Sequence, residues 1–201
     1  HVAQWGTFIR ARNVTAASAA IDLDVHIENN SAKEQSAELV TRIFALDAAF
    51  KKMGRPTATF SKSLLNIKAG EKKKIANTVT ITNPKLWGPL PVQKPNMYVA
   101  VTSLLVNGKL VDVYEKEFGI RSLLFDPLKG LLINGIPVKF QGVNQHHDLG
   151  ALGAAFNLRA AERQLEILQE MGCNAIRISH NPPAPELLDL TDRMGMLVID
   201  E

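Results

Sequence analysis

The chain has a single cysteine, Cys173, among its 201 residues, so no disulfide can form within it. No uninterrupted apolar run approaches 18 residues, and we therefore expect no membrane-spanning helix. The net charge is only +3, and the lysine runs at 51–52 and 72–74 contain no interleaved aromatic residues. These runs predict solvated turns, so neither a nucleic acid nor a membrane is expected as a partner.

The remaining composition is that of an ordinary folded protein, with 46% hydrophobic and 21% charged residues. Basic residues outnumber acidic ones in residues 1–120, whereas acidic residues outnumber basic ones in residues 121–201. This shift predicts two differently built halves. His1 opens the chain without an initiator methionine or a leader-like segment. We therefore expect an excised piece of a longer protein, and the compartment, cytoplasmic or periplasmic and secreted, stays open.

Residues 1–120 have the pattern of an all-β domain. Ala20–Glu28 alternates apolar and polar side chains over nine positions, which is typical of a half-buried strand. Asn107-Gly108 predicts a tight hairpin, because both positions of such a turn favour a positive φ. Seven short strands with frequent turns predict an immunoglobulin-like β-sandwich, in which we expect Trp87 to plug one end. The predicted strands are Phe8–Asn13, Ala20–Glu28, Glu38–Leu46, Thr57–Leu65, Lys74–Ile81, Met97–Val106 and Leu110–Ile120.

Residues 121–201 are predicted to hold a linker hairpin and the start of an α/β domain. Asn134-Gly135 indicates the hairpin turn. Two helical patterns follow, the first with Asn157 as its N-cap and the second ending at Gly195. The alternation of short apolar strands with helices predicts a parallel sheet. The helices are expected over 158–171 and 182–194, and the second and third strands over 174–178 and 196–199.

Each predicted parallel strand ends in polar residues, which are Asn144–Asp148, Ser179–Asn181 and Asp200–Glu201. Polar side chains at the carboxyl ends of successive strands form the active site of a (β/α)8 barrel. Because such a barrel needs about 250 residues, we expect only its first three strands and two helices here. The predicted fold class is therefore a multi-domain β plus α/β protein, with an immunoglobulin-like β-sandwich followed by a truncated barrel.

The charged residues and histidines near the strand ends limit which catalytic and metal-binding sites the chain can form. Arg177 lies within an apolar strand, where its guanidinium needs a partner that Asp200 or Glu201 can supply. Asp200 and Glu201 are neighbours, so on a strand their side chains point to opposite faces and cannot flank one scissile bond. His146 and His147 are also adjacent, which argues against joint metal binding from a regular strand. We predict no metal ligand, and a metal-dependent barrel hydrolase using these histidines and His180 stays an alternative.

Several motifs occur in a characteristic order along the chain. They are Asn83–Trp87, Phe118–Arg121, Leu132–Gly135, Gly142–His147, Asn174–Pro182 and Asp192–Glu201. Together they resemble glycoside hydrolase family 2, and its β-galactosidase branch in particular. The resemblance implies a retaining enzyme that cleaves terminal β-glycosidic bonds, with an acid/base glutamate after the fourth barrel strand and a nucleophilic glutamate at the seventh. No catalytic residue is then expected within residues 1–201, and this chain alone is predicted to be inactive.

The resemblance also implies roles for polar residues at the strand ends. The predicted substrate-binding residues are Asn144, His146 and His180, and the predicted supporting residues are Arg177, Asp200 and Glu201. Arg177 corresponds to the arginine beside the nucleophile, where a fixed positive charge keeps a carboxyl pKa low. The sequence departs from the family pattern at Gln145, where arginine is usual, and at Asn181, where tyrosine is usual.

The predicted function is that of a β-galactosidase, with β-glucuronidase or another family 2 specificity as the alternative. A non-catalytic carbohydrate-binding or scaffold module is the alternative from a different class. It ranks lower because Trp5 and Trp87 are the only tryptophans of the predicted sandwich. The expected partner is a carbohydrate such as a β-galactoside, and a homo-oligomer is compatible with the resemblance. No cofactor is identifiable in residues 1–201, and a divalent cation in the full-length enzyme is left open.

Overall fold

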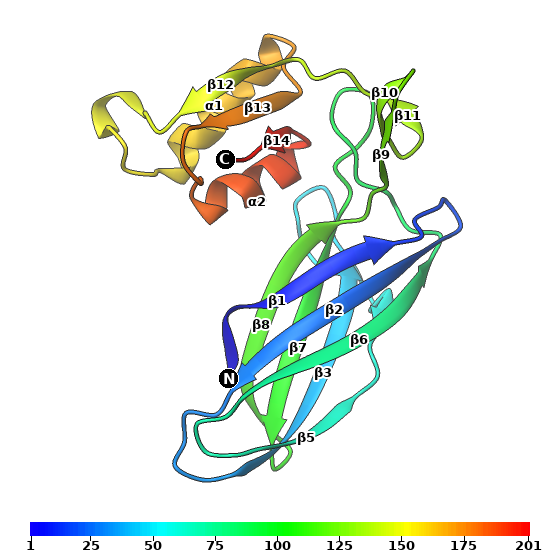
Figure 1. The fold of residues 1–201 in the computed structure, drawn as a ribbon, viewed down its shortest axis with the longest axis vertical. Coiled ribbons are helices and arrows are strands. Elements are labelled where there is room, and N and C mark those ends of the chain that lie inside the picture. Colours follow the sequence, from blue (N-terminus) through cyan, green and yellow to red (C-terminus); the bar gives the residue numbers. More distant parts are fainter. The chain divides into compact units, whose positions relative to one another are not determined.

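The computed structural model describes every residue from His1 to Glu201 and contains two compact units (Figure 1). The first unit comprises residues 1–85 and 97–122, and the second comprises residues 86–96 and 123–201. The sandwich range of 1–120 expected from the sequence also included residues 86–96, which the structure assigns to the second unit. None of the helices has the length and apolar character that a membrane crossing requires.

One sheet of the first unit is antiparallel and contains β1 (Val2–Arg12), β2 (Ser18–Glu28) and β6 (Lys72–Thr82), in that order. The alternation in β2 buries Ile21, Leu23, Val25 and Ile27 against the sandwich core. Intervening polar residues of β2 face outward. On that outer face the Lys72 and Lys74 side chains pair with acidic residues of β2, so the lysine run at 72–74 begins a strand and does not form the expected turn.

The other sheet contains β3 (Gln35–Ala45), β7 (Met97–Val106) and β8 (Lys109–Gly119), with the short strands β4 (Ala58–Thr59) and β5 (Ser63–Ile67) also pairing with β3. Its buried face is apolar except where the Thr41 and Thr102 hydroxyls hydrogen-bond to each other at 2.9 Å. One sheet thus contains β1, β2 and β6, and the facing sheet contains β3, β7 and β8. This is the arrangement of an immunoglobulin-like sandwich.

The turn signal of the sandwich is confirmed, whereas two of the predicted strands differ. Asn107 and Gly108 both have positive φ angles and connect β7 to β8. The strand expected over Phe8–Asn13 is part of the longer β1, which begins at Val2. The single strand expected over Thr57–Leu65 is instead two short strands, β4 and β5, separated by residues 60–62. The Phe60 side chain in this break is buried in the core, and its backbone amide still donates to the Thr41 carbonyl of β3 at 3.0 Å.

The second unit contains a small antiparallel sheet made of β9 (Leu123–Asp126), β10 (Gly130–Ile133) and β11 (Ile136–Pro137). The turn at Asn134-Gly135 is confirmed, because both residues have positive φ angles. The third strand, β9, was not expected. The Asn134 amide nitrogen also donates to the Trp87 carbonyl at 2.8 Å, which ties this sheet to residues 86–96.

Trp87 does not plug the sandwich, and the expectation from the sequence is wrong on this point. Its side chain is only 1% exposed and lies in the second unit. The indole Nε1 donates to the Asp192 carbonyl oxygen at 2.7 Å, and the Leu90 amide donates to the Gly195 carbonyl at 3.0 Å. Residues 86–96 therefore leave the sandwich and hold the C-terminal end of the helix at 185–194 in the second unit.

The rest of the second unit alternates strands and helices. It contains β12 (Gly142–His146), a 3₁₀ turn at Gly150–Leu152, α1 (Leu158–Glu170), β13 (Ala175–Ser179), α2 (Pro185–Met194) and β14 (Leu197–Ile199). The three strands are parallel in the order β12-β13-β14, as the sequence predicts. Ile176 and Ile178 of β13 pack with apolar residues of both helices in one core, so α1 and α2 cover the same face of this sheet (Figure 1).

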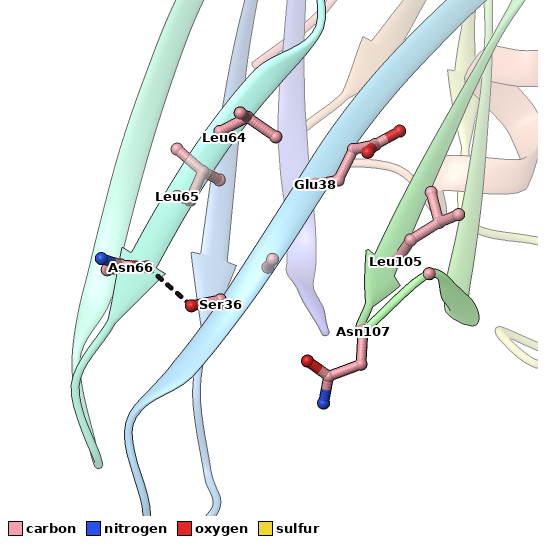
Figure 2. Close-up of a pocket in the computed structure, with 9 residues that line it drawn as sticks. Ser36, Glu38, Leu64, Leu65, Asn66, Leu105 and Asn107 are labelled. Carbon is pink, nitrogen blue, oxygen red and sulfur yellow. Dashed lines mark hydrogen bonds between the residues drawn. The ribbon is translucent and has the colours of Figure 1, made fainter.

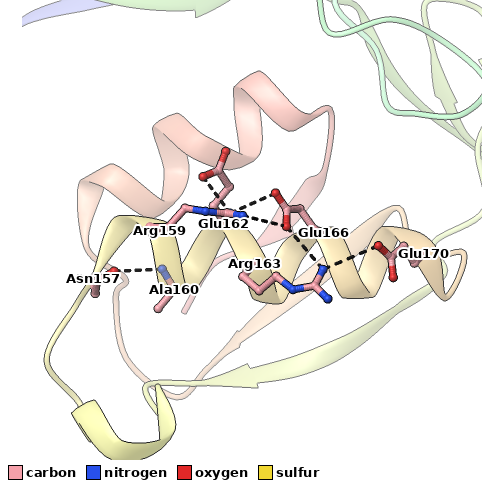
Figure 3. A network of polar contacts seen from close by, with 7 residues as sticks. All are labelled: Asn157, Arg159, Ala160, Glu162, Arg163, Glu166 and Glu170. Atoms are coloured by element: carbon pink, nitrogen blue, oxygen red, sulfur yellow. Dashed lines mark hydrogen bonds and ion pairs between the residues drawn. The ribbon is translucent and has the colours of Figure 1, made fainter.

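The predicted start of α1 and the predicted end of α2 are confirmed, whereas α2 begins at Pro185 and not at residue 182 as expected. The Asn157 side chain accepts a hydrogen bond from the Ala160 amide at 3.0 Å and caps α1, and Gly195 closes α2 in the left-handed conformation. Figure 3 shows the cap beside a row of ion pairs on the outer side of α1, formed by Arg159 and Arg163 with glutamates one and two turns away. Leu190 lies on the buried side of α2, together with Leu187 and Thr191.

Candidate functional site

The register of the parallel sheet brings the polar strand ends together. Asn144 of β12 lies opposite Arg177 of β13, and His146 lies opposite Ser179. Because side chains alternate along a strand, these residues occupy the face that points away from α1 and α2. This is the face that a closed (β/α)8 barrel turns toward its interior.

Gly142 allows the first two strands to approach closely. A Cβ atom at this position would lie 2.1 Å from the Ala175 carbonyl oxygen, closer than any real side chain permits. The absence of a side chain at Gly142 therefore sets the spacing between β12 and β13 below the polar residues.

Arg177 is the centre of a polar network. Its Nη1 donates to Asn144 Oδ1 at 3.2 Å and to Ser179 Oγ at 3.0 Å. Its Nη2 forms an ion pair with the carboxylate of Glu201, immediately beyond β14. Of the two acidic partners left open by the sequence, Glu201 is the one that Arg177 contacts. The planar guanidinium thereby holds side chains from all three strands in one arrangement.

His180 completes the network on the side of Glu201. Its Nδ1 lies 3.1 Å from Glu201 Oε2. The hydrogen bond from His180, together with the charge of Arg177, holds the pKa of the Glu201 carboxyl below its ordinary value. Glu201 is therefore a carboxylate at neutral pH and orients both the arginine and the histidine.

His146 joins this cluster through its ring. The His146 and His180 imidazoles meet edge to face, with centroids 5.7 Å apart and an angle of 72° between the rings. The structure thus brings together Asn144, His146, Arg177, His180 and Glu201. We name these five residues the polar cluster.

Two other residues near the strand ends lie outside the polar cluster. Asp200 is exposed and takes no part in the ion pair with Arg177. His147 lines a neighbouring cavity and does not join the ring contact between His146 and His180. No group of three or more His, Cys, Asp or Glu side chains is arranged to hold a metal. The three histidines therefore do not form the ligand set that the metal-dependent alternative requires.

A cavity of about 480 Å³ includes His146 of the polar cluster but lies on the side of the sheet that the helices cover, because Leu165, Ile178 and Leu187 also line it. It lies between the loop after β12, the loop after β13, the first two turns of α1 and the first turn of α2. His146 and Asn181 are among its lining residues, and most of the others are apolar. The sequence gave no signal for this cavity, because residues from four separate segments form it. Ser179, which contacts Arg177, was also missed as a site residue, although it precedes His180 directly.

The sandwich carries a hollow of a different kind. It has a volume of about 390 Å³ and lies on β3, β5 and the β7–β8 turn (Figure 2). Ser36, Glu38, Leu64 and Asn66 are among the residues that line this hollow. Within it, Ser36 Oγ donates a hydrogen bond to Asn66 Oδ1 at 2.8 Å. No aromatic side chain lines it, so it lacks the stacking surface on which many carbohydrate-binding modules depend.

Comparison with known proteins places both units in one family. The description "Glycosyl hydrolases family 2" matches residues 1–121, and "Glycosyl hydrolases family 2, TIM barrel domain" matches residues 127–201. A β-galactosidase of Bacteroides ovatus is 43% identical over 100% of this chain and 22% of its own length. A β-glucuronidase of Formosa agariphila is 30% identical over 96% of this chain and 19% of its own length.

Solved structures agree with this grouping. A glycosyl hydrolase family 2 member from Bacteroides cellulosilyticus superimposes with a TM-score of 0.88 and 35% identity, over 100% of this chain and 26% of that one. A β-glucuronidase of glycoside hydrolase family 2 gives a TM-score of 0.86 at 30% identity, over 97% and 20% of the two chains. The chain spans about a fifth of the length of the curated relatives, 22% and 19%. It belongs to glycoside hydrolase family 2, with the family's sandwich domain over residues 1–121 and the start of its TIM barrel domain from residue 127.

Proposed function

We propose that the complete protein encoded with this chain hydrolyses a terminal β-glycosidic bond, with a β-galactoside as substrate. The reaction would be a double displacement through a covalent glycosyl-enzyme. The observation that carries the proposal is the polar cluster, in which three parallel strands direct hydrogen-bonding groups to one place at their carboxyl ends. The 43% identical relative named as a β-galactosidase supports the choice of sugar.

The hydrogen bonds within the polar cluster leave specific donor and acceptor atoms available to bind a sugar. Asn144 Oδ1 accepts from Arg177, so its amide nitrogen keeps two donors for hydroxyl oxygens. His180 Nδ1 faces Glu201, so its Nε2 is the ring atom directed to substrate. His146 holds its imidazole against His180 without giving up a ring nitrogen to another side chain. Hydroxyl groups, which donate and accept, match this mixture of an amide and two imidazoles.

Arg177 and Glu201 have positioning roles in this proposal. Glu201 is paired with a guanidinium and has a lowered pKa, so it is a poor proton donor at neutral pH. Retaining hydrolysis needs two carboxyl groups about 5–5.5 Å apart, and the polar cluster contains one. The resemblance places the catalytic pair on the fourth and seventh barrel strands, and we therefore propose that residues 1–201 bind and position without performing the chemistry.

A β-glucuronide is the second candidate, because the Formosa agariphila relative at 30% identity is named as a β-glucuronidase. A glucuronide carries a carboxylate that needs a cationic partner. The one guanidinium of the polar cluster is already occupied by Glu201. This pairing favours a neutral sugar at the cluster.

Turnover of 4-nitrophenyl β-D-galactoside and 4-nitrophenyl β-D-glucuronide by the complete protein tests the proposal. We expect a higher kcat/KM for the galactoside, and a loss of about 10- to 100-fold in His180→Ala, the scale of one or two hydrogen bonds to substrate. Residues 1–201 alone should release no nitrophenol. Absence of turnover of either glycoside by the complete protein would overturn the proposal, and sugar binding by residues 1–122 alone would then favour a binding module.

A further inference from the structure

We infer that Gln164 of α1 is a positioning residue for His146, because it holds the chain on both sides of this histidine and so fixes the direction in which the imidazole meets the sugar. This inference rests on the proposed function, in which His146 contacts a hydroxyl group of the substrate. Gln164 lies outside the polar cluster, on the helix side of the sheet, and acts only through His146.

His146 is the least restrained member of the polar cluster. Hydrogen bonds or ion pairs join the other four residues to one another. The His146 ring has only its edge-to-face contact with His180, at a centroid distance of 5.7 Å, and its side chain is exposed. The direction of this imidazole therefore depends on the backbone at the end of β12.

The amide group of Gln164 binds the chain before and after the two adjacent histidines. Gln145 Nε2 donates to Gln164 Oε1 at 2.8 Å, and Gln164 Nε2 donates to the Asp148 carbonyl oxygen at 3.1 Å. The Asp148 amide in turn donates to the His146 carbonyl oxygen at 2.8 Å, which closes a tight turn around His147. One side chain thus joins the residue before His146 to the turn that follows it.

The alternation of side chains along β12 explains how a helix residue acts on the opposite face of the sheet. Gln145 points toward the helices and bonds to Gln164, whereas the next side chain, His146, points toward the polar cluster. A tilt of the strand end at Gln145 therefore also turns His146. Gln164 is itself well supported, because Asn157 caps α1 and the neighbouring Leu165 is only 1% exposed in the core. The helix is thus a rigid support for the end of the strand.

A double-mutant cycle in the complete protein tests the inference. The substrates are 4-nitrophenyl β-D-galactoside and 4-nitrophenyl β-D-glucuronide, so that the choice of sugar does not decide the result. Gln164→Met keeps the length of the side chain and removes both hydrogen bonds. We expect it to lower kcat/KM for the preferred glycoside by about tenfold, because a displacement of about 1 Å costs up to about 100-fold. In a His146→Ala background the same change should alter kcat/KM by less than about twofold, because the group that Gln164 positions is gone.

Two further glutamine-to-methionine variants complete the test. Gln169 lies on the same helix, is also half-buried, and donates to the Met194 carbonyl at 2.7 Å, so it bonds to the end of α2 and not to β12. Gln169→Met should therefore change kcat/KM by the same factor with and without His146. Gln145→Met removes only the hydrogen bond between Gln145 and Gln164, so it should give part of the loss, and only when His146 is present. This variant carries the test if Gln164→Met does not fold.

The division of the loss between kcat and KM gives a second readout. Gln164→Met should change the two constants in the same proportion as His146→Ala does, because it acts through that side chain. A smaller fraction of folded protein would instead lower the apparent kcat and leave KM unchanged.

The outcomes separate this inference from the proposed function. If the complete protein hydrolyses a glycoside but the methionine variants at 145 and 164 have no effect, or the same effect with and without His146, the positioning role is overturned and the sugar site stands. Wild-type kcat/KM in His146→Ala would also overturn it, because Gln164 would then have nothing to position. If neither glycoside is hydrolysed, the proposed function fails and the inference fails with it.

Discussion

Replacement of Trp87 by alanine tests the unexpected role of residues 86–96. The side chain is 1% exposed, and its Nε1 donates to the Asp192 carbonyl at 2.7 Å. Loss of a buried tryptophan costs about 3–5 kcal/mol through lost contacts and the cavity left behind. The carbonyl of Asp192 would in addition lose its donor, which costs about 1–3 kcal/mol when the group stays buried. We therefore expect the free energy of unfolding of the second unit to fall by about 3–5 kcal/mol or more.

Hydrogen exchange of backbone amides measures this effect region by region. Protection should fall in α2 and β14, whereas the amides of β2, β3 and β7 should keep their wild-type protection. Trp87→Phe should fall between the wild type and the alanine variant, because it keeps most of the apolar contact and loses the N–H donor. Trp5→Ala is the matched control, since Trp5 is 73% exposed and its loss should change stability by less than about 0.5 kcal/mol. Loss of protection in the sandwich, with α2 unchanged, would refute this account of Trp87.

Three further predictions concern the sheets and the polar cluster. Gly142→Ala should destabilise the second unit by about 1–3 kcal/mol in chemical denaturation, because its Cβ would lie 2.1 Å from the Ala175 carbonyl; unchanged stability would contradict the close strand spacing. A hydrogen bond from Arg12 holds the pKa of Asp22 well below its ordinary value, so this carboxylate stabilises the fold above about pH 4. The gap in melting temperature between wild type and Asp22→Asn should close as the pH falls below about 4, and a gap independent of pH would be the contrary result. In the complete protein, Arg177→Lys should lower kcat/KM for a β-galactoside by about 100-fold, because an ammonium group cannot hold Asn144, Ser179 and Glu201 together; wild-type kinetics would argue against a positioning role.

Elements defined by local signals were predictable from the sequence. The α1 helix follows from its apolar spacing and from the Asn157 cap, and the β7–β8 hairpin follows from Asn107-Gly108. These features depend on interactions within a few residues. Trp87 shows the limit, because a buried tryptophan in a loop fits either unit equally well from its neighbours in sequence. Only its contact with Asp192, far along the chain, decides where it packs.

The polar cluster was predictable as a set, and its contacts were not. Parallel strands that end in polar residues bring Asn144, Arg177 and His180 to one edge whatever the details of packing. The choice of Glu201 over Asp200 as the partner of Arg177 depends on how the chain leaves β14, because strand geometry alone puts the two acids on opposite faces. The cavity depends on how two loops fold back over the helices, for which the sequence offers no periodic signal.

A crystal structure of the complete protein with phenyl 1-thio-β-D-galactoside tests the central claim most directly. The account predicts sugar hydroxyl groups within hydrogen-bond distance of Asn144 Nδ2 and His180 Nε2, with Arg177 and Glu201 still paired beside them. A sugar bound elsewhere on the protein, with these four side chains in separate environments, would contradict it.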